Sequence, residues 1–173
     1  MELLEAIKSR RSIRRFTGEE IPDEDLKTIL NAAIRAPSAG NLQPWEFIVV
    51  KNKETKKKLA RAALGQTWMI KAHVIVVVCA NIPRTARYYG ERGKILYCIQ
   101  DTAAAIQNML LTVHALGYGA CWVGAFSERE VKEILEIPEH VRPVALVPIG
   151  KPKENPPPRP RIPLEKVLHF EKY

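Results

Sequence analysis

The stretch that most restricts the fold of this 173-residue chain runs from Lys94 to Leu116 and is the longest helix that the sequence predicts. Apolar and small side chains between Ile95 and Val113 cover most of the circumference of this helix. A helix that is apolar nearly all round must be enclosed by protein. We therefore expect it to lie in the middle of the fold or in a subunit interface, and to end at Gly117.

Shorter segments surround this helix. Apolar residues three and four positions apart predict further helices over 2–8, 23–36 and 53–64, and one that begins after the capping residue Ser127. Apolar runs predict strands over 45–50, 73–80, 119–124 and 141–149. The strand over 73–80 is apolar throughout and is expected to be buried on both faces.

Two segments are harder to assign. Pro143 and Pro148 predict that the last strand lies at an edge or is irregular, because proline cannot donate to a strand ladder. Residues 81–93 receive no regular structure and are a candidate for a mobile cover. The elements lack a strict βαβ rhythm, and no G-x-G-x-x-G motif follows a strand, so we expect a single α+β domain over 1–173 rather than a Rossmann fold.

Composition excludes several classes of protein. No apolar run approaches the roughly 18 residues of a membrane span, and no secretory signal opens the chain, so we expect a cytoplasmic protein without a membrane partner. The net charge of +8 invites a polyanion, but the charge is dispersed and no nucleic-acid-binding motif accompanies it. The basic run over 51–58 is interpreted as the solvated side of a helix.

The cysteines and histidines predict neither a disulfide framework nor a metal site. The three cysteines lack a C-x-x-C spacing, and the four histidines are scattered without a ligand spacing. Cys121 lies beside Trp122 in an apolar stretch, which favours packing over a reactive thiol.

The segment Ser9–Phe16 places four arginines and the hydroxyl group of Ser12 within eight residues. If the segment is extended, Arg10, Ser12 and Arg14 share one face, and Ile13 points toward a core. Guanidinium groups match phosphate geometry and remain charged, so the face suits a phosphate-bearing cofactor. A solvated basic face or a patch for nucleic acid remains an equal alternative at this point.

The loop over 36–45 precedes a strand and carries Ser38, Asn41 and Gln43. Amide side chains offer both donors and acceptors, which suits the edge of a heterocycle, although the loop is also compatible with a simple turn. The segment over 151–163 contains six prolines and is expected to be an extended arm. The apolar residues that follow, from Leu164 to Phe170, need a surface to bury against, so we expect a docked arm over 151–173.

Four segments, taken in order, resemble the FMN-dependent nitroreductase superfamily. They are Ser-Arg-Arg-Ser-Ile-Arg-Arg-Phe at 9–16, the loop at 36–45, Leu-Gly-Tyr-Gly-Ala-Cys-Trp-Val-Gly-Ala-Phe at 116–126 and Arg-Pro-Arg-Ile-Pro-Leu-Glu-Lys-Val at 159–167. The resemblance implies an α+β fold with a mixed sheet flanked by helices and a long central buried helix. It also implies an intertwined homodimer with two FMN sites in its interface.

The resemblance further implies a set of cofactor-binding residues. They are Arg10, Arg11, Ser12, Arg14, Pro37, Ser38, Ala39, Asn41, Gln43, Gln66, Val123, Gly124, Ala125, Arg159 and Arg161. Arg10, Arg159 and Arg161 are expected around the phosphate, and Ser12 and Arg14 near the ribityl chain and the N1/O2 side of the ring. The residues of 37–43 are expected to reach the cofactor from the partner subunit. Main-chain N–H groups of Gly124 and Ala125 are expected near N5, and Gln66 at the pyrimidine edge.

The activity that the resemblance implies is transfer of hydride from NADH or NADPH through FMN to a nitroaromatic, quinone or similar acceptor, by a ping-pong mechanism. The cofactor carries the chemistry, so no catalytic side chain and no metal are expected. Dehalogenation, dehydrogenation or flavin breakdown on the same fold, and polyanion binding, are the alternatives. The sequence departs from the family at Trp68, where some relatives have a lysine, and in the short segment over 81–93, where longer relatives carry an insertion over the substrate pocket.

Overall fold

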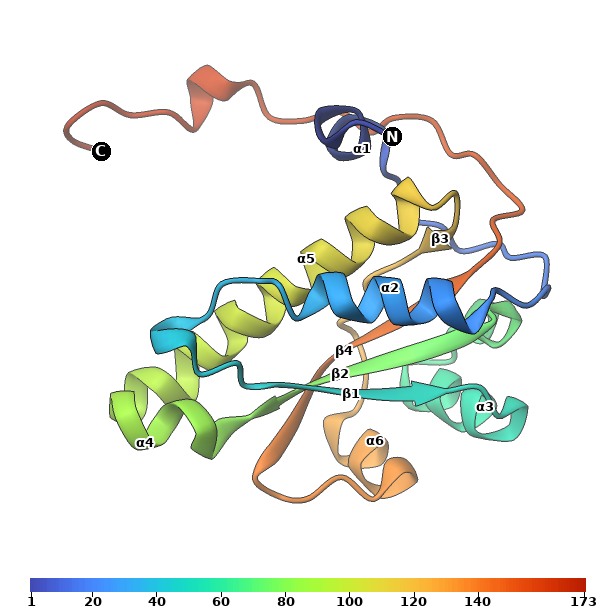
Figure 1. Cartoon of the computed structure of the whole chain (residues 1–173), viewed down its shortest axis with the longest axis horizontal. Coiled ribbons are helices and arrows are strands. Elements are labelled where there is room, and N and C mark those ends of the chain that lie inside the picture. The colour runs from blue at the N-terminus through green and yellow to red at the C-terminus, as the bar shows by residue number, and fades with distance from the viewer.

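A four-stranded sheet lies between two layers of helices in the structure, a computed structural model that describes residues 1–173 (Figure 1). The strands are β1 (Trp45–Val50), β2 (Val74–Asn81), β3 (Gly119–Ala120) and β4 (Val141–Gly150). Their order in the sheet is β1-β2-β4-β3, and every adjacent pair is antiparallel. Parallel pairing is limited to a single bridge between Ser12 and Ala120. The expected α+β class with a helix-flanked sheet is confirmed.

Six helices surround the sheet. They are α1 (Leu3–Ser9), α2 (Asp23–Ala33), α3 (Lys53–Ala62), α4 (Ile82–Arg92), α5 (Cys98–Ala115) and α6 (Glu128–Leu135). Helices α2 and α5 cover one face of the sheet, and α3 and α6 cover the other (Figure 1). Short 3₁₀ turns occur at Ala39–Asn41, Thr67–Lys71 and Leu164–Lys166.

Strand β2 separates the two halves of the core. Val74, Val76 and Val78 belong to the core beneath α2 and α5, whereas Ile75 and Val77 belong to the core above α3 and α6. Successive strand side chains point to opposite faces, so an uninterrupted apolar run can serve two cores at once. The expectation that this strand is buried on both faces is confirmed, because all but its last residue are buried.

The expected central helix is present as α5, which a π-helical turn over Gly93–Tyr97 precedes. Ala105, Ile106 and Met109 on one side of α5 are fully buried in the core. The opposite side remains partly open, since Ala103 and Leu111 are only half-buried and Gln107 is exposed. The helix is therefore central to the fold on one side and available for further packing on the other.

The expectation that residues 81–93 lack regular structure is wrong, because Ile82–Arg92 form α4, between the last residue of β2 and the first residue of the π-helical turn. Pro83 lies in the first turn, where its missing N–H costs nothing. Thr85 is fully buried, and a Cβ on Gly93 would lie 2.7 Å from the Thr85 carbonyl oxygen, so only glycine allows this approach. Gly90 kinks the helix with a φ of 55°. Sequence patterns do not predict this helix because it is stabilised by close backbone packing at Gly93 rather than by a stripe of apolar side chains.

Of the two alternatives expected for strand β4, the edge position is wrong, since the strand lies between β2 and β3, and the irregularity is confirmed by a register shift in its pairing with β2. Its prolines fall where pairing is irregular. Pro143 adjoins a register shift opposite Val78 and Cys79, and Pro148 follows the end of the two-residue pairing with β3. The strand expected over 119–124 is correspondingly short, with only an isolated bridge from Val123 to Leu146 beyond Ala120.

The arm over 151–173 is extended, but it does not dock on its own chain as expected. Beyond residue 154 its prolines offer no donors for further pairing. The arm leaves the domain, passes α1 and ends far from the sheet (Figure 1). Ile162 and Phe170 are consequently 68% and 80% exposed.

None of the helices combines the length and the apolarity needed to cross a bilayer.

Candidate cofactor site

Arginines from the two ends of the chain line one cavity of about 540 Å³. The lining residues are Arg10, Arg11, Ser12, Arg14, Glu154, Pro156, Pro157, Arg159 and Arg161. We call this space the arginine cavity. Its composition is unusual because every lining residue except Pro156 and Pro157 has a charged or polar side chain. The arrangement is that of a binding site for a charged group rather than for an apolar one.

A short pairing of backbone segments brings these arginines together. Phe16 forms an antiparallel bridge with Pro152, the Thr17 N–H donates to the Lys151 carbonyl over 3.0 Å, and the Lys153 N–H donates to the Arg15 carbonyl over 2.8 Å. One carboxylate oxygen of Glu154, Oε1, accepts the main-chain N–H groups of Arg14 and Arg15 over 2.6 and 3.0 Å. Residues 14–17 and 151–154 thus form a terminal clasp, which directs the following arm back over Arg10.

The segment that carries Ser12 is held flat against the sheet. The Ile13 N–H donates to the Ala120 carbonyl over 2.9 Å, and the Ile13 side chain is 8% exposed. A Cβ on Gly119 would lie 2.8 Å from Ile13 Cγ2, so glycine is required at this approach. Arg10, Ser12 and Arg14 all line the arginine cavity, as alternation along an extended chain predicts, but Arg11 lines it too, which alternation does not predict.

The arginine cavity carries positive charge that the protein does not neutralise. Burial lowers the pKa of the Arg10 guanidinium, and the neighbouring Arg161 and Arg11 lower it further. Glu154 is the single carboxylate in the lining, and its Oε1 is engaged by the clasp. Arg11 also uses its Nη1 to donate to the Lys8 and Arg10 carbonyls. Like charges held this close favour an anionic ligand that carries more than one charge.

A second group of expected site residues adjoins Arg14. The Arg14 guanidinium lies 6.0 Å from the centre of the Trp68 ring, within cation–π range. Gln66 Nε2 donates to the Ala125 carbonyl over 3.4 Å. Gly124 and Ala125 are exposed, and their N–H groups donate to no other protein group. These residues therefore present free main-chain donors next to the arginine cavity.

Val123 differs from its neighbours. Its side chain is buried, and its N–H and carbonyl both pair with Leu146 over 2.9 Å. It can fix the backbone of Gly124 but has no polar group left for a ligand.

The loop that carries the amide side chains contains strained backbone and is held in place by contacts with Asp101 and Arg84. Asn41 and Gln43 have φ values of 56° and 50°, in the left-handed region that few non-glycine residues adopt. Ser38 Oγ accepts the Gln43 N–H over 3.0 Å. The Asp101 carboxylate accepts the Ala39 N–H over 3.1 Å, and Arg84 Nη1 donates to the Gln43 carbonyl over 2.8 Å. Pro37, Asn41 and Gln43 are left exposed on the surface.

One chain does not bring this loop to the arginine cavity. The loop is bound to Asp101 near the start of α5, whereas Ser9 Oγ, just before Arg10, lies 2.7 Å from Nε2 of His114 near the end of α5. Thirteen residues of helix separate Asp101 from His114, or about 20 Å at 1.5 Å per residue. Figure 1 shows the same separation, with the turn that follows α2 near the start of α5 and the segment that follows α1 near its C-terminal end.

Sequence reasoning missed the residues that position the site. Glu154, Asp101 and Arg84 each hold the backbone of a site segment that is far away in sequence. Asp101 had a weak signal, since it is a lone acid in a helix that is otherwise apolar in its middle. Glu154 and Arg84 lie among other charged residues, so the sequence gave no signal for either of them.

A helix-flanked antiparallel sheet with a cationic cavity beside free main-chain donors defines an α+β protein built to hold an anionic ligand. Comparison with known proteins identifies the family. The sequence profile described as "Nitroreductase family" matches residues 7–68 and 62–151. The chain therefore belongs to the nitroreductase family of oxidoreductases.

Individual relatives agree with this assignment. A protein of Archaeoglobus fulgidus named "Putative NADH dehydrogenase/NAD(P)H nitroreductase" is 40% identical, over 89% of this chain and 87% of its own length. A protein of the same name from Methanothermobacter thermautotrophicus is 37% identical, over 100% of this chain and 88% of its own. The solved structure of an NADPH:FMN oxidoreductase from Vibrio harveyi, complexed with NAD+, has a TM-score of 0.91 at 30% identity and covers 99% of this chain and 77% of its own.

Proposed function

We propose that this protein is an NAD(P)H-dependent flavin oxidoreductase that binds FMN in a homodimer. The observation that carries the proposal is the arginine cavity, in which Arg10, Arg159 and Arg161 converge without a free counter-ion. The phosphate of FMN is a dianion with oxygens on all sides, and guanidinium groups from two directions suit it. The names of the relatives, which mention NAD(P)H and FMN, support the same choice.

The remaining residues of the first group fit the rest of the cofactor. Ser12 and Arg14 would lie along the ribityl chain and the N1/O2 side of the ring. The contact with Trp68 limits the freedom of the Arg14 guanidinium, so its charge is already placed. Gln66 would face the pyrimidine edge, and the free N–H groups of Gly124 and Ala125 would face N5.

A second copy of the chain would complete the site. Within one chain, the loop with Asn41 and Gln43 lies about 20 Å from the arginine cavity, so only a partner's loop can meet the cofactor there. Exposed apolar residues on α1 and the arm support a large interface. Leu3 and Leu4 are 64% and 69% exposed, and Leu164 and Val167 are 64% and 56% exposed. Such a surface is typical of a chain that buries it against a partner.

Bound FMN would supply the redox chemistry, by accepting a hydride from NADH or NADPH and passing reducing equivalents to an acceptor. This chain's residues bind and orient. Arg14 favours negative charge on the N1/O2 side of the ring, and main-chain donors mark the N5 side without adding an acid or a base. Cys121 takes no part, because burial raises the pKa of its thiol. One open face used in turn by nicotinamide and by a nitroaromatic or quinone gives a ping-pong mechanism.

Steady-state assays with NADH and NADPH against nitrofurazone, menadione and free FMN test this function. We expect a yellow protein that absorbs between about 350 and 500 nm, and parallel lines in double-reciprocal plots. A flavin-bound protein that is inert towards both nicotinamides would contradict nicotinamide-dependent reduction and favour another flavin chemistry, such as dehalogenation, dehydrogenation or flavin breakdown. A colourless protein that binds DNA with a steep salt dependence would contradict the flavin itself.

A further inference from the structure

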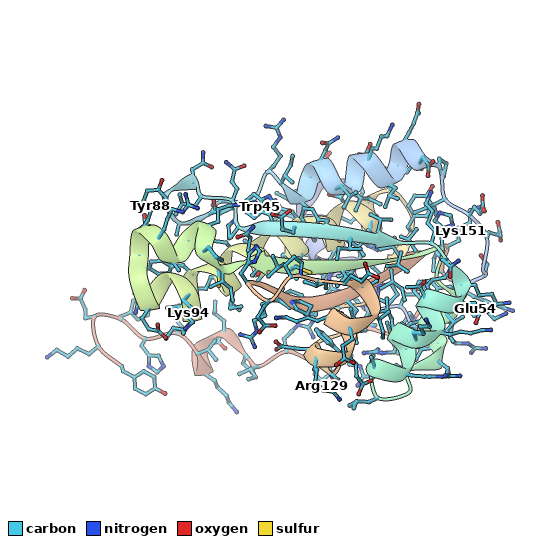
Figure 2. All side chains as sticks on the ribbon, turned by 90° about the horizontal axis from the view of Figure 1, so that it is seen from below. Trp45, Glu54, Tyr88, Lys94, Arg129 and Lys151 are labelled. Carbon is cyan, nitrogen blue, oxygen red and sulfur yellow. The ribbon has the colours of Figure 1, made fainter.

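A second cationic cavity, of about 580 Å³, is lined from Gly18 onward, directly after the terminal clasp, and shares no lining residue with the arginine cavity. It is bounded by the connector before α2, by the start of α3 and by the residues that lead into β2. Lys51, Lys53, Lys56 and Lys71 line it, and we call it the lysine cavity. Glu54, labelled in Figure 2, marks the start of α3 at this end of the molecule.

Lys56 is the most unusual residue of the lysine cavity. The basic run over 51–58 was expected to be solvated, yet Lys56 is only 7% exposed. Its Nζ donates to the Ala72 carbonyl over 2.7 Å and to the His73 carbonyl over 3.1 Å, and it pairs with no carboxylate. An ammonium group has three N–H donors, so one remains. A buried cation without a counter-ion is unfavourable, and burial accordingly lowers the pKa of Lys56.

His73 contributes a second unsatisfied polar group to the lysine cavity. Its Nε2 is buried and has no hydrogen-bond partner. Burial lowers the pKa of this imidazole, nearby Lys51 and Lys56 lower it further, and Glu20 and Asp23 act in the opposite direction. Buried polar atoms normally have hydrogen-bond partners. The unpaired Nε2 of His73 and the third N–H of Lys56, both in residues that line this cavity, therefore point to a missing polar ligand.

The charges around the lysine cavity favour an anion with two negative charges. Lys51 Nζ lies 2.5 Å from Asp23 Oδ1, so these two residues neutralise each other. Of the other lining residues, Lys53, Lys56 and Lys71 each carry a positive charge and Glu20 carries a negative one. The cavity therefore has an excess of two positive charges. A metal ion is not favoured, because no three His, Cys, Asp or Glu side chains gather where they could hold one.

We propose that the lysine cavity binds a phosphate-bearing anion, either pyrophosphate or a phosphate ester. Three ammonium groups from α3 and from the turn Thr67–Lys71 would surround the anion from different directions, which suits a tetrahedral phosphate better than a planar carboxylate. The volume exceeds that of one phosphate, so a second phosphate or an organic group is accommodated. This proposal is independent of the proposed function, because it uses none of the residues assigned to the flavin.

The test is calorimetric titration of inorganic pyrophosphate into the full-length protein in excess FMN, so that the arginine cavity is occupied if it binds flavin. The probe variant is Lys53→Ala/Lys71→Ala, which spares the buried Lys56 and therefore the fold. The control Lys57→Ala/Lys58→Ala also removes two positive charges, both from α3, but changes no residue of the cavity. A second control, Arg159→Ala/Arg161→Ala, alters the arginine cavity alone.

We expect the affinity for pyrophosphate to fall about tenfold or more in the probe variant, as loss of two charge-assisted contacts requires, and to stay within about twofold in both controls. In NMR spectra of the unmodified protein, pyrophosphate should raise the pKa of His73, because the anion favours the imidazolium. Equal losses in the probe and control variants would show diffuse attraction and overturn the proposal. Loss confined to the arginine double variant, or no binding at about 10 mM pyrophosphate, would overturn it as well.

Discussion

The two ends of α5 hold site residues by opposite means. At its C-terminal end, the arginine cavity joins segments that are about 140 residues apart, through the backbone pairing of the terminal clasp. At its N-terminal end, the amide loop is a single contiguous stretch, with strained backbone at Asn41 and Gln43 and side-chain anchors from α4 and α5. The first region concentrates charge, and the second presents neutral amides.

This difference indicates what each region can do without the other. The arginine cavity is complete in one chain and can bind an anion on its own. The amide loop is held by Asp101 and Arg84 of its own chain, but its Asn41 and Gln43 side chains are exposed at the far end of the helix. If the two regions share one ligand, affinity should depend strongly on the arginines and on the dimer, and weakly on the loop.

Removal of residues 156–173 should have the largest effect. It deletes Arg159, Arg161 and the exposed apolar arm but keeps the clasp. We expect FMN affinity to fall about 1000-fold or more, from the loss of two charged contacts, and the dimer to dissociate. Light scattering and fluorescence titration measure both.

The full-length variant Arg159→Ala/Arg161→Ala separates these two effects, since it should lose FMN and keep the dimer. A truncated protein that stays dimeric and retains FMN would show that the arm serves neither region.

Arg10→Ala should weaken FMN binding about 10- to 100-fold, as loss of one charged hydrogen-bonded contact predicts. Arg15→Ala is the matched control, because Arg15 lies five residues further along the chain, carries the same charge and does not line the arginine cavity. Fluorescence titration compares them at constant salt. Equal losses in the two variants would mean that net charge, and not the geometry of the cavity, governs binding.

Gln43→Gly tests the amide loop and should change stability and affinity in opposite directions. Glycine adopts a φ of 50° without strain, so the free energy of unfolding should rise by up to about 1 kcal/mol. Loss of the side-chain amide should weaken FMN binding about 2- to 10-fold. Glu136→Gly is the control, since Glu136 has a φ of 54° at the end of α6, away from both regions. It should raise stability with no change in FMN affinity; a parallel loss of affinity would contradict a direct role for Gln43.

Asp101→Asn should have the smallest effect and should be visible mainly in the pH dependence of stability. Burial raises the pKa of the Asp101 carboxyl, and its Oδ2 lacks a partner. A group whose pKa is raised by folding holds its proton more tightly in the native state, so it destabilises the fold as pH rises above the unfolded pKa of about 4. Asparagine keeps an acceptor for the Ala39 N–H and does not ionise.

Chemical denaturation of both proteins at pH 4 and pH 7 measures this effect. The variant should gain about 1 kcal/mol relative to the parent between the two values. The exposed Glu2→Gln serves as a control with no such gain. A constant difference between parent and variant across this range would mean that the Asp101 carboxyl is not destabilised by burial.

Much of the fold could be predicted, because periodicity reports burial. The apolar run of β2, the stripe of α2 and the enclosed helix α5 each carry their environment in their side chains. Helix α4 and the internal position of β4 could not be predicted, since they depend on backbone fit at Gly93 and on irregular pairing at Pro143.

The types of residue in the site could also be predicted from the sequence, whereas the contacts that bring them together could not. A row of arginines indicates an anion, and the structure places Arg10 and Arg161 close together, as the family resemblance implies. The anchors Glu154 and Asp101 depend on contacts across the whole chain, which no local pattern records. Burial of Lys56 within the otherwise solvated basic run over 51–58 was missed for the same reason, because it is decided by the carbonyls of Ala72 and His73.

The terminal clasp also sets a time for cofactor loading during biosynthesis. Residues 151–154 are synthesised more than 130 residues after their partners at 14–17. A nascent polypeptide whose C-terminal end is still inside the ribosome has the sheet's early strands but no Arg159 or Arg161 near Arg10. Pairings of such long sequence separation also form late in folding. Flavin capture in the cell should therefore follow emergence of residues 151–161 from the ribosome and should not assist the folding of the segments made before them.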